Sequence, residues 1–134
     1  MLDHSLESAF AAFLQTDPSL AGVHFFTGHE DEEHLLPAVT VTSKSESLAG
    51  SAAVFRADVS LLIESEAHDS EPVEHAALVD KVRAWLANKA AVVAAINAGN
   101  QVHLYGYAFT GSSLGVDGKR FRTTLTLKAG YGTP

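Results

Sequence analysis

A short pattern at residues 111–115 matches the G-x-S-x-G signature of serine hydrolases. In those enzymes the central serine, here Ser113, sits on a strained turn between a strand and a helix and acts as the nucleophile. In this chain a glycine-rich stretch and another β-rich segment follow Ser113, and the last histidine, His103, precedes it. Because the hydrolase order needs a histidine after the serine, we interpret residues 111–118 as a flexible hairpin loop and expect no serine nucleophile.

Histidine and carboxylate side chains gather between His29 and His34. With His24, His68 or His75 they could form a nitrogen and oxygen site for a divalent ion. The two histidines of the segment are five positions apart, so they lack the i, i+4 spacing that places two ligands on one helix face. We interpret the segment as a solvated acidic loop and expect no metal or other cofactor, with a metal-binding module as an alternative. The acidic residues of this loop are Glu30, Asp31, Glu32 and Glu33.

Three carboxylates, Asp58, Glu64 and Glu66, lie at even spacing in one β-rich segment and therefore on one face of the predicted strand. Such a set is typical of metal-dependent nucleases. No lysine follows Glu64 or Glu66 at the alternate position that such a site would use, and the chain has few cations with which to hold phosphate. We interpret the three residues as exposed strand acids.

Aromatic side chains offer a further way to bind a ligand, by stacking. Trp85 lies on the apolar stripe of a predicted helix, which indicates a place in the core. Tyr105, Tyr107 and Phe109 follow one another at alternate positions, and the tyrosines fall on the face opposite Leu104. Because amphipathic rings are enriched at protein interfaces, we expect the tyrosines to cover an interface. None of these patterns predicts an enzyme.

The 134 residues, 46% of them apolar and 19% charged, fit a single folded domain spanning residues 1–134. The chain has no cysteine, which excludes disulfides, thiolate metal sites and a cysteine nucleophile. The N-terminus has no basic region typical of a signal peptide, and no apolar run is long enough to cross a bilayer. We therefore expect no export by that route and no membrane partner.

The net charge of −7 argues against tight binding of nucleic acid, which requires a clustered basic surface. The charge is also unevenly distributed. Residues 1–43 hold seven acids and no Lys or Arg, whereas residues 117–134 hold four cations and one acid. This asymmetry would let like copies dock acidic face to basic face, a contact that generates rings when the rotation closes. The alternative is that these charges are the solvated faces of a monomer. The expected interface residues are Glu30, Asp31, Glu32, Glu33, Lys44, Lys119, Arg120 and Arg122.

Hydrophobic periodicity predicts the elements that position these residues. We expect a mostly antiparallel sheet of about five strands with helices packed on one face, in the order α-β-β-β-α-α-β-β, which is an α+β fold. Residues 43–51 have no periodicity and are interpreted as a mobile loop or hairpin arm. The expected elements are a helix over 5–15, strands over 23–27, 37–43 and 55–65, a long helix opened by residues 70–72, a shorter helix over 90–96 ended by Gly99 as a left-handed cap, and strands over 101–110 and 119–129.

Several segments carry a resemblance that spans nearly the whole chain. They are the T-D-P at 16–18 after the first helix, L-P-A-V-T-V at 36–41, F-R-A-D-V-S-L at 55–61, A-L-V-D-K-V-R-A-W-L at 77–86 and R-F-R-T-T-L-T-L at 120–127. In this order the chain resembles the small tail terminator, or tail completion, proteins of long-tailed bacteriophages.

The resemblance implies a structural virion protein. Its subunits would form a homohexameric ring on the last ring of the tail tube, stop tube growth and present a surface to the head. The implied partners are further copies of the chain, the tail tube protein, a head-tail connector or stopper protein, and DNA that passes through the lumen without specific binding. The implied location is the tail and neck of the virion, after assembly in the host cytoplasm. The alternatives are a connector or stopper of the same neck region and a small-ligand or metal-binding module.

Overall fold

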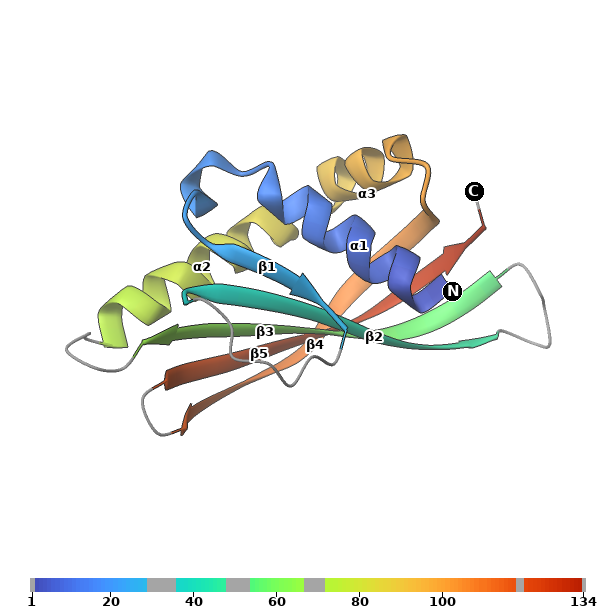
Figure 1. Ribbon diagram of the computed structural model, residues 1–134. Coiled ribbons are helices and arrows are strands. Elements are labelled where there is room, and N and C mark those ends of the chain that lie inside the picture. The colour runs from blue at the N-terminus through green and yellow to red at the C-terminus, as the bar shows by residue number, and fades with distance from the viewer. Residues whose placement is uncertain (1, 29–35, 48–53, 67–71, 118–119, 134) are drawn as a thin grey trace.

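The computed structural model describes residues 2–28, 36–47, 54–66, 72–117 and 120–133. Five strands form one sheet, and the three α-helices lie over one of its faces (Figure 1), which confirms the predicted α+β fold and its element order. The elements are α1 (Leu2–Gln15), the short 3-10 helix η1 (Pro18–Leu20), β1 (His24–Thr27), β2 (Ala38–Ser47), β3 (Val54–Glu66), α2 (Pro72–Ala87), α3 (Lys89–Ala98), β4 (His103–Asp117) and β5 (Arg120–Gly132).

The strands lie in the order β1-β2-β3-β5-β4, so β1 and β4 are the two edges of the sheet. The short strand β1 runs parallel to β2, and the other three pairs are antiparallel. The sheet is therefore mixed but mostly antiparallel, as predicted. Among the described residues, no helix lies over the second face, which we call the bare face of the sheet (Figure 1).

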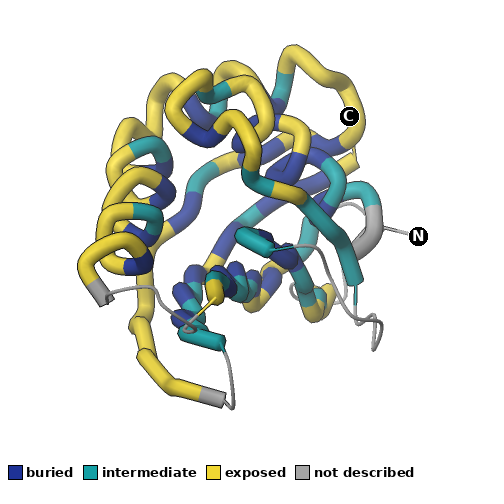
Figure 2. The backbone as a smooth tube through the Cα atoms, turned by 60° about the vertical axis from the view of Figure 1, so that its left-hand side comes forward, coloured by how far each residue is buried: buried dark blue, intermediate teal, exposed yellow. Residues whose placement is uncertain are grey.

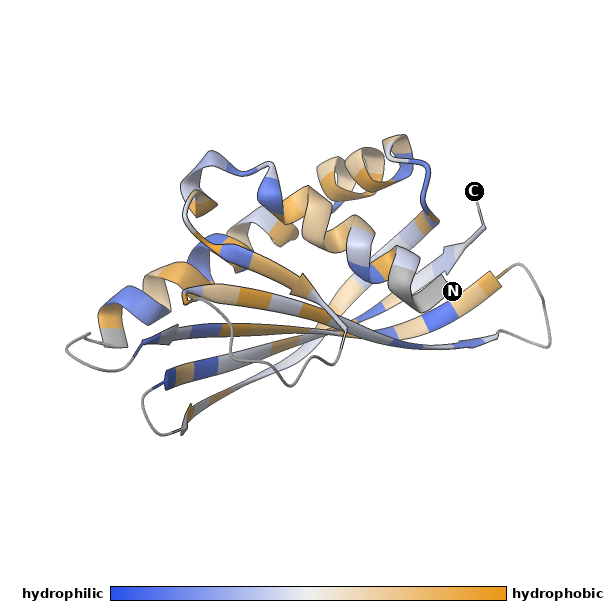
Figure 3. Cartoon of the chain, in the orientation of Figure 1, coloured by the Kyte–Doolittle hydropathy of each residue, from blue (hydrophilic) through white to orange (hydrophobic). Residues whose placement is uncertain are grey.

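The core lies between the helices and the face of the sheet that they cover, which we call the helix side. Along β3, alternate residues turn to the helices and are fully buried, as the sequence alternation predicted, and apolar and polar positions alternate along the strands (Figure 3). In α1, Leu6, Phe10 and Leu14 recur at a spacing of four residues and are fully buried against this layer. Each such side chain contributes about 1.5–3 kcal/mol through removal from water. The buried residues of β3 are Ala57, Val59, Leu61 and Ile63.

The end of α3 differs from the prediction. Gly99 has a φ of −72°, within the right-handed helical region, and it is Asn100 that takes the left-handed conformation with a φ of 59°. Asparagine adopts this region more readily than most residues. The side chain of Asn97 then accepts a hydrogen bond from the Leu104 amide at 2.6 Å, which ties the end of α3 to the start of β4. In the described part of the chain, no helix is both long and apolar enough to cross a membrane.

The predicted loop over residues 111–118 is wrong for the described part of that range. Residues 111–117 continue β4, where Ser112 pairs with Leu125 and Val116 with Phe121. The turn-like composition of 111–115 is overridden because β5 alternates strongly and supplies a partner at every position. In the same way, residues 43–47, expected in a loop, pair with β3 as part of β2, and the rest of the 43–51 segment lies outside the described residues.

Candidate functional site

The G-x-S-x-G segment does not form a nucleophile turn. Ser113 lies within β4 and pairs with Thr124 of β5, on the bare face of the sheet. A nucleophilic serine of this class needs a strand-to-helix turn that lifts its hydroxyl out of the backbone. The residues on either side of Ser113 continue the regular pairing with β5, so this segment does not adopt that turn.

The expectation of three exposed strand acids is wrong for Glu64. This side chain is only 2% exposed. Arg122 lies directly opposite Glu64 in the β3–β5 register, and Arg120 follows two positions away on the same face. Their guanidinium groups approach the same carboxylate oxygen, Oε2, with Arg120 Nη1 at 3.1 Å and Arg122 Nε at 3.5 Å. Two cations therefore compensate one buried charge, which is the condition for keeping an ionised carboxylate out of water.

Other charges on the bare face also lie opposite one another. Lys44, Asp58 and Lys128 form one row across β2, β3 and β5, and Glu46 faces Arg56 in the next row. Opposite charges at directly facing positions stabilise a strand pair by about 0.2–1 kcal/mol. The bare face therefore carries alternating charges and is not a single-sign surface.

The predicted interface residues divide into three groups. Arg120 and Arg122 hold Glu64 within the chain, so a charge reversal at these positions would disturb the fold as well as any docking. Lys44 is exposed on the bare face. The remaining ones, Glu30, Asp31, Glu32, Glu33 and Lys119, lie outside the described residues.

The histidines considered as metal ligands do not come together in the described structure. His75 is buried, His24 is exposed on β1, and His29, His34 and His68 lie outside the described residues. The described residues contain no group of three His, Asp or Glu side chains placed to hold a metal ion.

His75 forms a polar contact of its own, which the sequence did not indicate. Its Nδ1 lies 2.6 Å from the Ser65 hydroxyl and its Nε2 lies 2.7 Å from the Thr123 hydroxyl. Burial lowers the pKa of His75 from 6.5. In a neutral imidazole ring one nitrogen donates a hydrogen bond and the other accepts one, so the ring can bind one hydroxyl as acceptor and the other as donor. The Phe121 ring lies beside His75, with 5.6 Å between the ring centroids. The cluster joins α2 to β3 and β5.

The aromatic residues of β4 do not share one face. A bulge between Leu104 and Gly106 shifts the alternation by one residue. Tyr107 therefore turns to the core, where its hydroxyl donates to the Leu86 carbonyl and burial raises its pKa to about 12. The expectation that both tyrosines cover an interface is wrong for Tyr107, whereas Tyr105 is exposed. Trp85 packs against the core as predicted, with its ring stacked on Phe13 at 5.3 Å.

The second half of β4 forms an exposed apolar edge. Every residue from 108 to 116 is exposed (Figure 2), and Leu114 and Val116 are 70% and 64% exposed. Four of the five large apolar side chains that are exposed in the described structure belong to this strand: Tyr105, Phe109, Leu114 and Val116. Because soluble monomers rarely expose apolar side chains in contiguous groups without a role, this edge is the strongest candidate for a functional surface.

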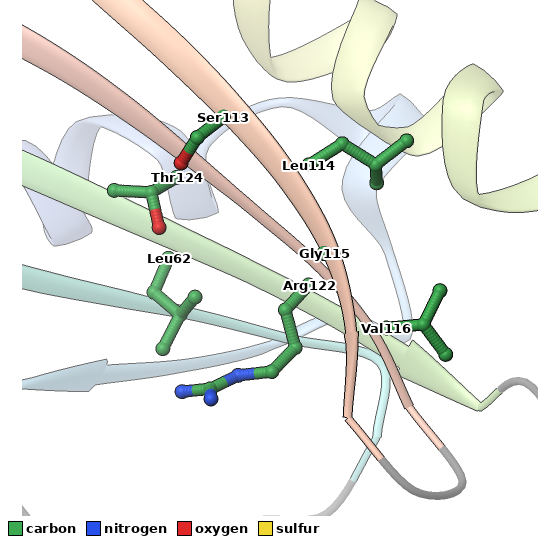
Figure 4. Close-up of a pocket in the computed structure, with 7 residues that line it drawn as sticks. All are labelled: Leu62, Ser113, Leu114, Gly115, Val116, Arg122 and Thr124. Atoms are coloured by element: carbon green, nitrogen blue, oxygen red, sulfur yellow. The ribbon is translucent and has the colours of Figure 1, made fainter.

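Hollows border this edge on both faces of the sheet. On the helix side, a groove of about 480 Å³ runs between α2 and β4 and is lined by Val79, Arg83, Leu114 and Val116, among others. On the bare face, a hollow of about 400 Å³ includes Arg122 and Thr124, which point away from the side on which Leu114 and Val116 project (Figure 4).

No protein-family model matches this chain, and a search of the curated proteins finds no significantly similar one. The fold and the exposed edge of β4 are the features of the molecule that bear on its function.

Proposed function

We propose that this protein is a structural virion protein, a tail terminator or tail completion subunit that assembles into a hexameric ring and closes the tail tube of a long-tailed bacteriophage. The observation that carries the proposal is the exposed apolar edge of β4. A surface of this kind favours association with another protein chain. The proposal also draws on the resemblance of the sequence to this family and on the α+β fold of the chain.

The chemistry-bearing side chains of the described structure support a structural role. The carboxylate of Glu64 is compensated by Arg120 and Arg122, and both ring nitrogens of His75 are engaged by hydroxyls. These groups hold strands and helices together within the chain. We therefore propose no catalytic activity and no cofactor.

The proposed partners follow from the position of a terminator ring. One side of the ring would contact the tail tube protein and the other a head-tail connector or stopper protein, in the neck of a virion assembled in the host cytoplasm. DNA would pass through the lumen without specific binding, because a chain of net charge −7 attracts phosphate weakly. A connector or stopper subunit of the same neck region is a closely related alternative.

The test is the size and shape of the protein in solution. Light scattering over a concentration series, combined with negative-stain images at the highest concentration, is expected to find closed rings of about six subunits. Raised salt is expected to loosen any part of the contact made by exposed ion pairs, while the apolar part persists. Monomers at every concentration would contradict the proposal.

The groove between α2 and β4 favours a second candidate function, the binding of a small apolar ligand. Its volume of about 480 Å³ is within the usual range for small-molecule sites. A medium-chain fatty acid such as decanoate is a suitable probe. Saturable binding that a Val79→Asp substitution abolishes, in a protein that forms no rings, would favour this candidate over the terminator.

A further inference from the structure

The free edge of β4 lacks the features that normally protect an edge strand from pairing. Natural edges carry lysine, proline or inward-pointing charge, or they are very short. The strand β4 has fifteen residues, and residues 104–116 contain no charged residue and no proline. Over residues 108–116 both of its faces are exposed. At about 3.4 Å per residue this segment offers some 30 Å of open backbone hydrogen-bonding groups.

The opposite edge of the sheet is β1 (His24–Thr27), which is short and contains no Asp, Glu, Lys or Arg. Glycines with positive φ lie before and after it, Gly22 at 89° and Gly28 at 78°, so regular strand geometry does not extend past either of them. Its register with β2 places Phe25 on the helix side, beside Val39, and His24 and Phe26 on the bare face. Within the described residues, β1 and β4 are the only strands with one neighbour.

The strand directions decide how these two edges can meet. The strand β1 runs with β2, β3 runs against β2, β5 runs against β3, and β4 runs against β5, so β4 is antiparallel to β1. A second copy placed in the same orientation at the β4 edge therefore presents its β1 antiparallel to β4. Antiparallel pairing is the slightly more stable arrangement. The same placement keeps the helices of both copies on one side of a continuous sheet.

We propose that neighbouring subunits contact one another by strand addition, an inference that rests on the proposed function as a ring-forming subunit. In this contact, β1 of one copy pairs antiparallel with the exposed half of β4 of the next. Phe25 of the added strand lies on the helix side, the same side as Leu114 and Val116, and covers these side chains. Each copy uses one edge of each kind, so the contact is head-to-tail, and once the ring closes every β1 and every β4 has a second partner strand. The twist between adjacent strands rotates each copy relative to the last.

The absence of cysteine makes cross-linking a clean test. The variant His24→Cys places a thiol on the bare face of β1. It is combined in turn with Ala108→Cys, Gly111→Cys or Ser113→Cys, three bare-face positions of β4 that sample different registers. The matched controls combine His24→Cys with Ser112→Cys or Leu114→Cys, which lie on the same strand but on the helix side. Mild oxidation followed by denaturing electrophoresis is the readout.

The expected result is a disulfide-linked ladder that extends beyond the dimer for at least one bare-face pair, and no ladder for the helix-side controls. The ladder is also expected to be lost when Ser112→Lys and Leu114→Lys are added, and to persist with the control Ala84→Lys, an exposed position of α2.

Three results would overturn the inference. Rings in the electron microscope without cross-links from any bare-face pair would reject strand addition and leave the terminator function standing. Dimers that form with Ser113→Cys alone would show a two-fold contact between two β4 strands. Monomers with neither rings nor cross-links would reject both the contact and the proposed function.

Discussion

The ion pairs of Glu64 with Arg120 and Arg122 predict that removal of the two arginines lowers the stability of the fold substantially. The double substitution Arg120→Ala and Arg122→Ala removes both cations that pair, among the described residues, with a carboxylate that is 2% exposed. Removal of the partners of a buried charge costs about 3–5 kcal/mol when both sides are fully buried. The side chains of the two arginines are 31% and 41% exposed, so part of their interaction is screened by water. We therefore expect a loss of about 2–3 kcal/mol in the free energy of unfolding.

The assay is chemical and thermal unfolding of the purified variants. For a domain of 134 residues, this loss corresponds to a Tm lower by about 6–15 °C. The matched control is Lys44→Ala with Lys128→Ala, which removes two exposed cations from the same face and is expected to cost less than about 1 kcal/mol.

A third variant isolates the cause of the loss. Adding Glu64→Gln to the arginine double variant removes the uncompensated charge, so we expect it to recover about 1–2 kcal/mol, whereas Glu64→Gln in the native background is destabilising. An arginine double variant that is no less stable than the lysine control, or a Glu64→Gln effect that is equal in both backgrounds, would contradict this role of the two arginines.

The remaining predictions concern the core and its polar contacts. Burial lowers the pKa of His75 in the folded protein below the unfolded value of 6.5. The contribution of the neutral ring to stability is therefore fully present above pH 6.5 and is lost as the pH falls through the lower folded pKa. Unfolding experiments at pH 7.5 and 5.0 are expected to show a loss of stability at the lower pH in the native protein and a smaller loss in His75→Gln. Tyr107→Phe removes a hydroxyl that donates to the Leu86 carbonyl and should cost about 1 kcal/mol in urea unfolding. Spectroscopic titration of the native protein should include the ionisation of Tyr107 with a pKa of about 12, and Tyr107→Phe should lose that contribution. Leu61→Ala, in the fully buried centre of β3, should cost about 2–5 kcal/mol, whereas Val73→Ala, which is 68% exposed, should change stability by less than about 0.5 kcal/mol; equal effects of the two would contradict the assigned core.

The parts of the fold that the sequence predicted well are those with strong local signals. The alternation over residues 55–65 and the helical spacing in residues 5–15 each reflect contact with one common core. The hydrophobic pattern alone therefore predicts the strand and the helix. The distal half of β4 was missed because its composition of glycine and serine is typical of turns. Its conformation is determined by β5, a partner that local composition does not reveal.

The candidate functional surface was only partly predictable for the same reason. The burial of Glu64 depends on which β5 residue stands opposite it, and this register is a property of the folded sheet. The inward turn of Tyr107 depends on a bulge at one residue of β4. The sequence indicated that acidic and basic segments lie apart, whereas the exposed apolar edge of β4 emerged only when the order of strands placed this strand at the side of the sheet.

Native mass spectrometry of the unmodified chain tests the central claim most directly. A terminator subunit that pairs its sheet edges into a ring predicts one dominant assembly of six chains of 14.2 kDa, about 85 kDa. Little material is expected at intermediate sizes, because only in the closed ring does every β1 and every β4 have a second partner strand. A spectrum that contains only the 14.2 kDa monomer over the whole concentration range, or an open series of oligomers with no preferred size, would contradict it.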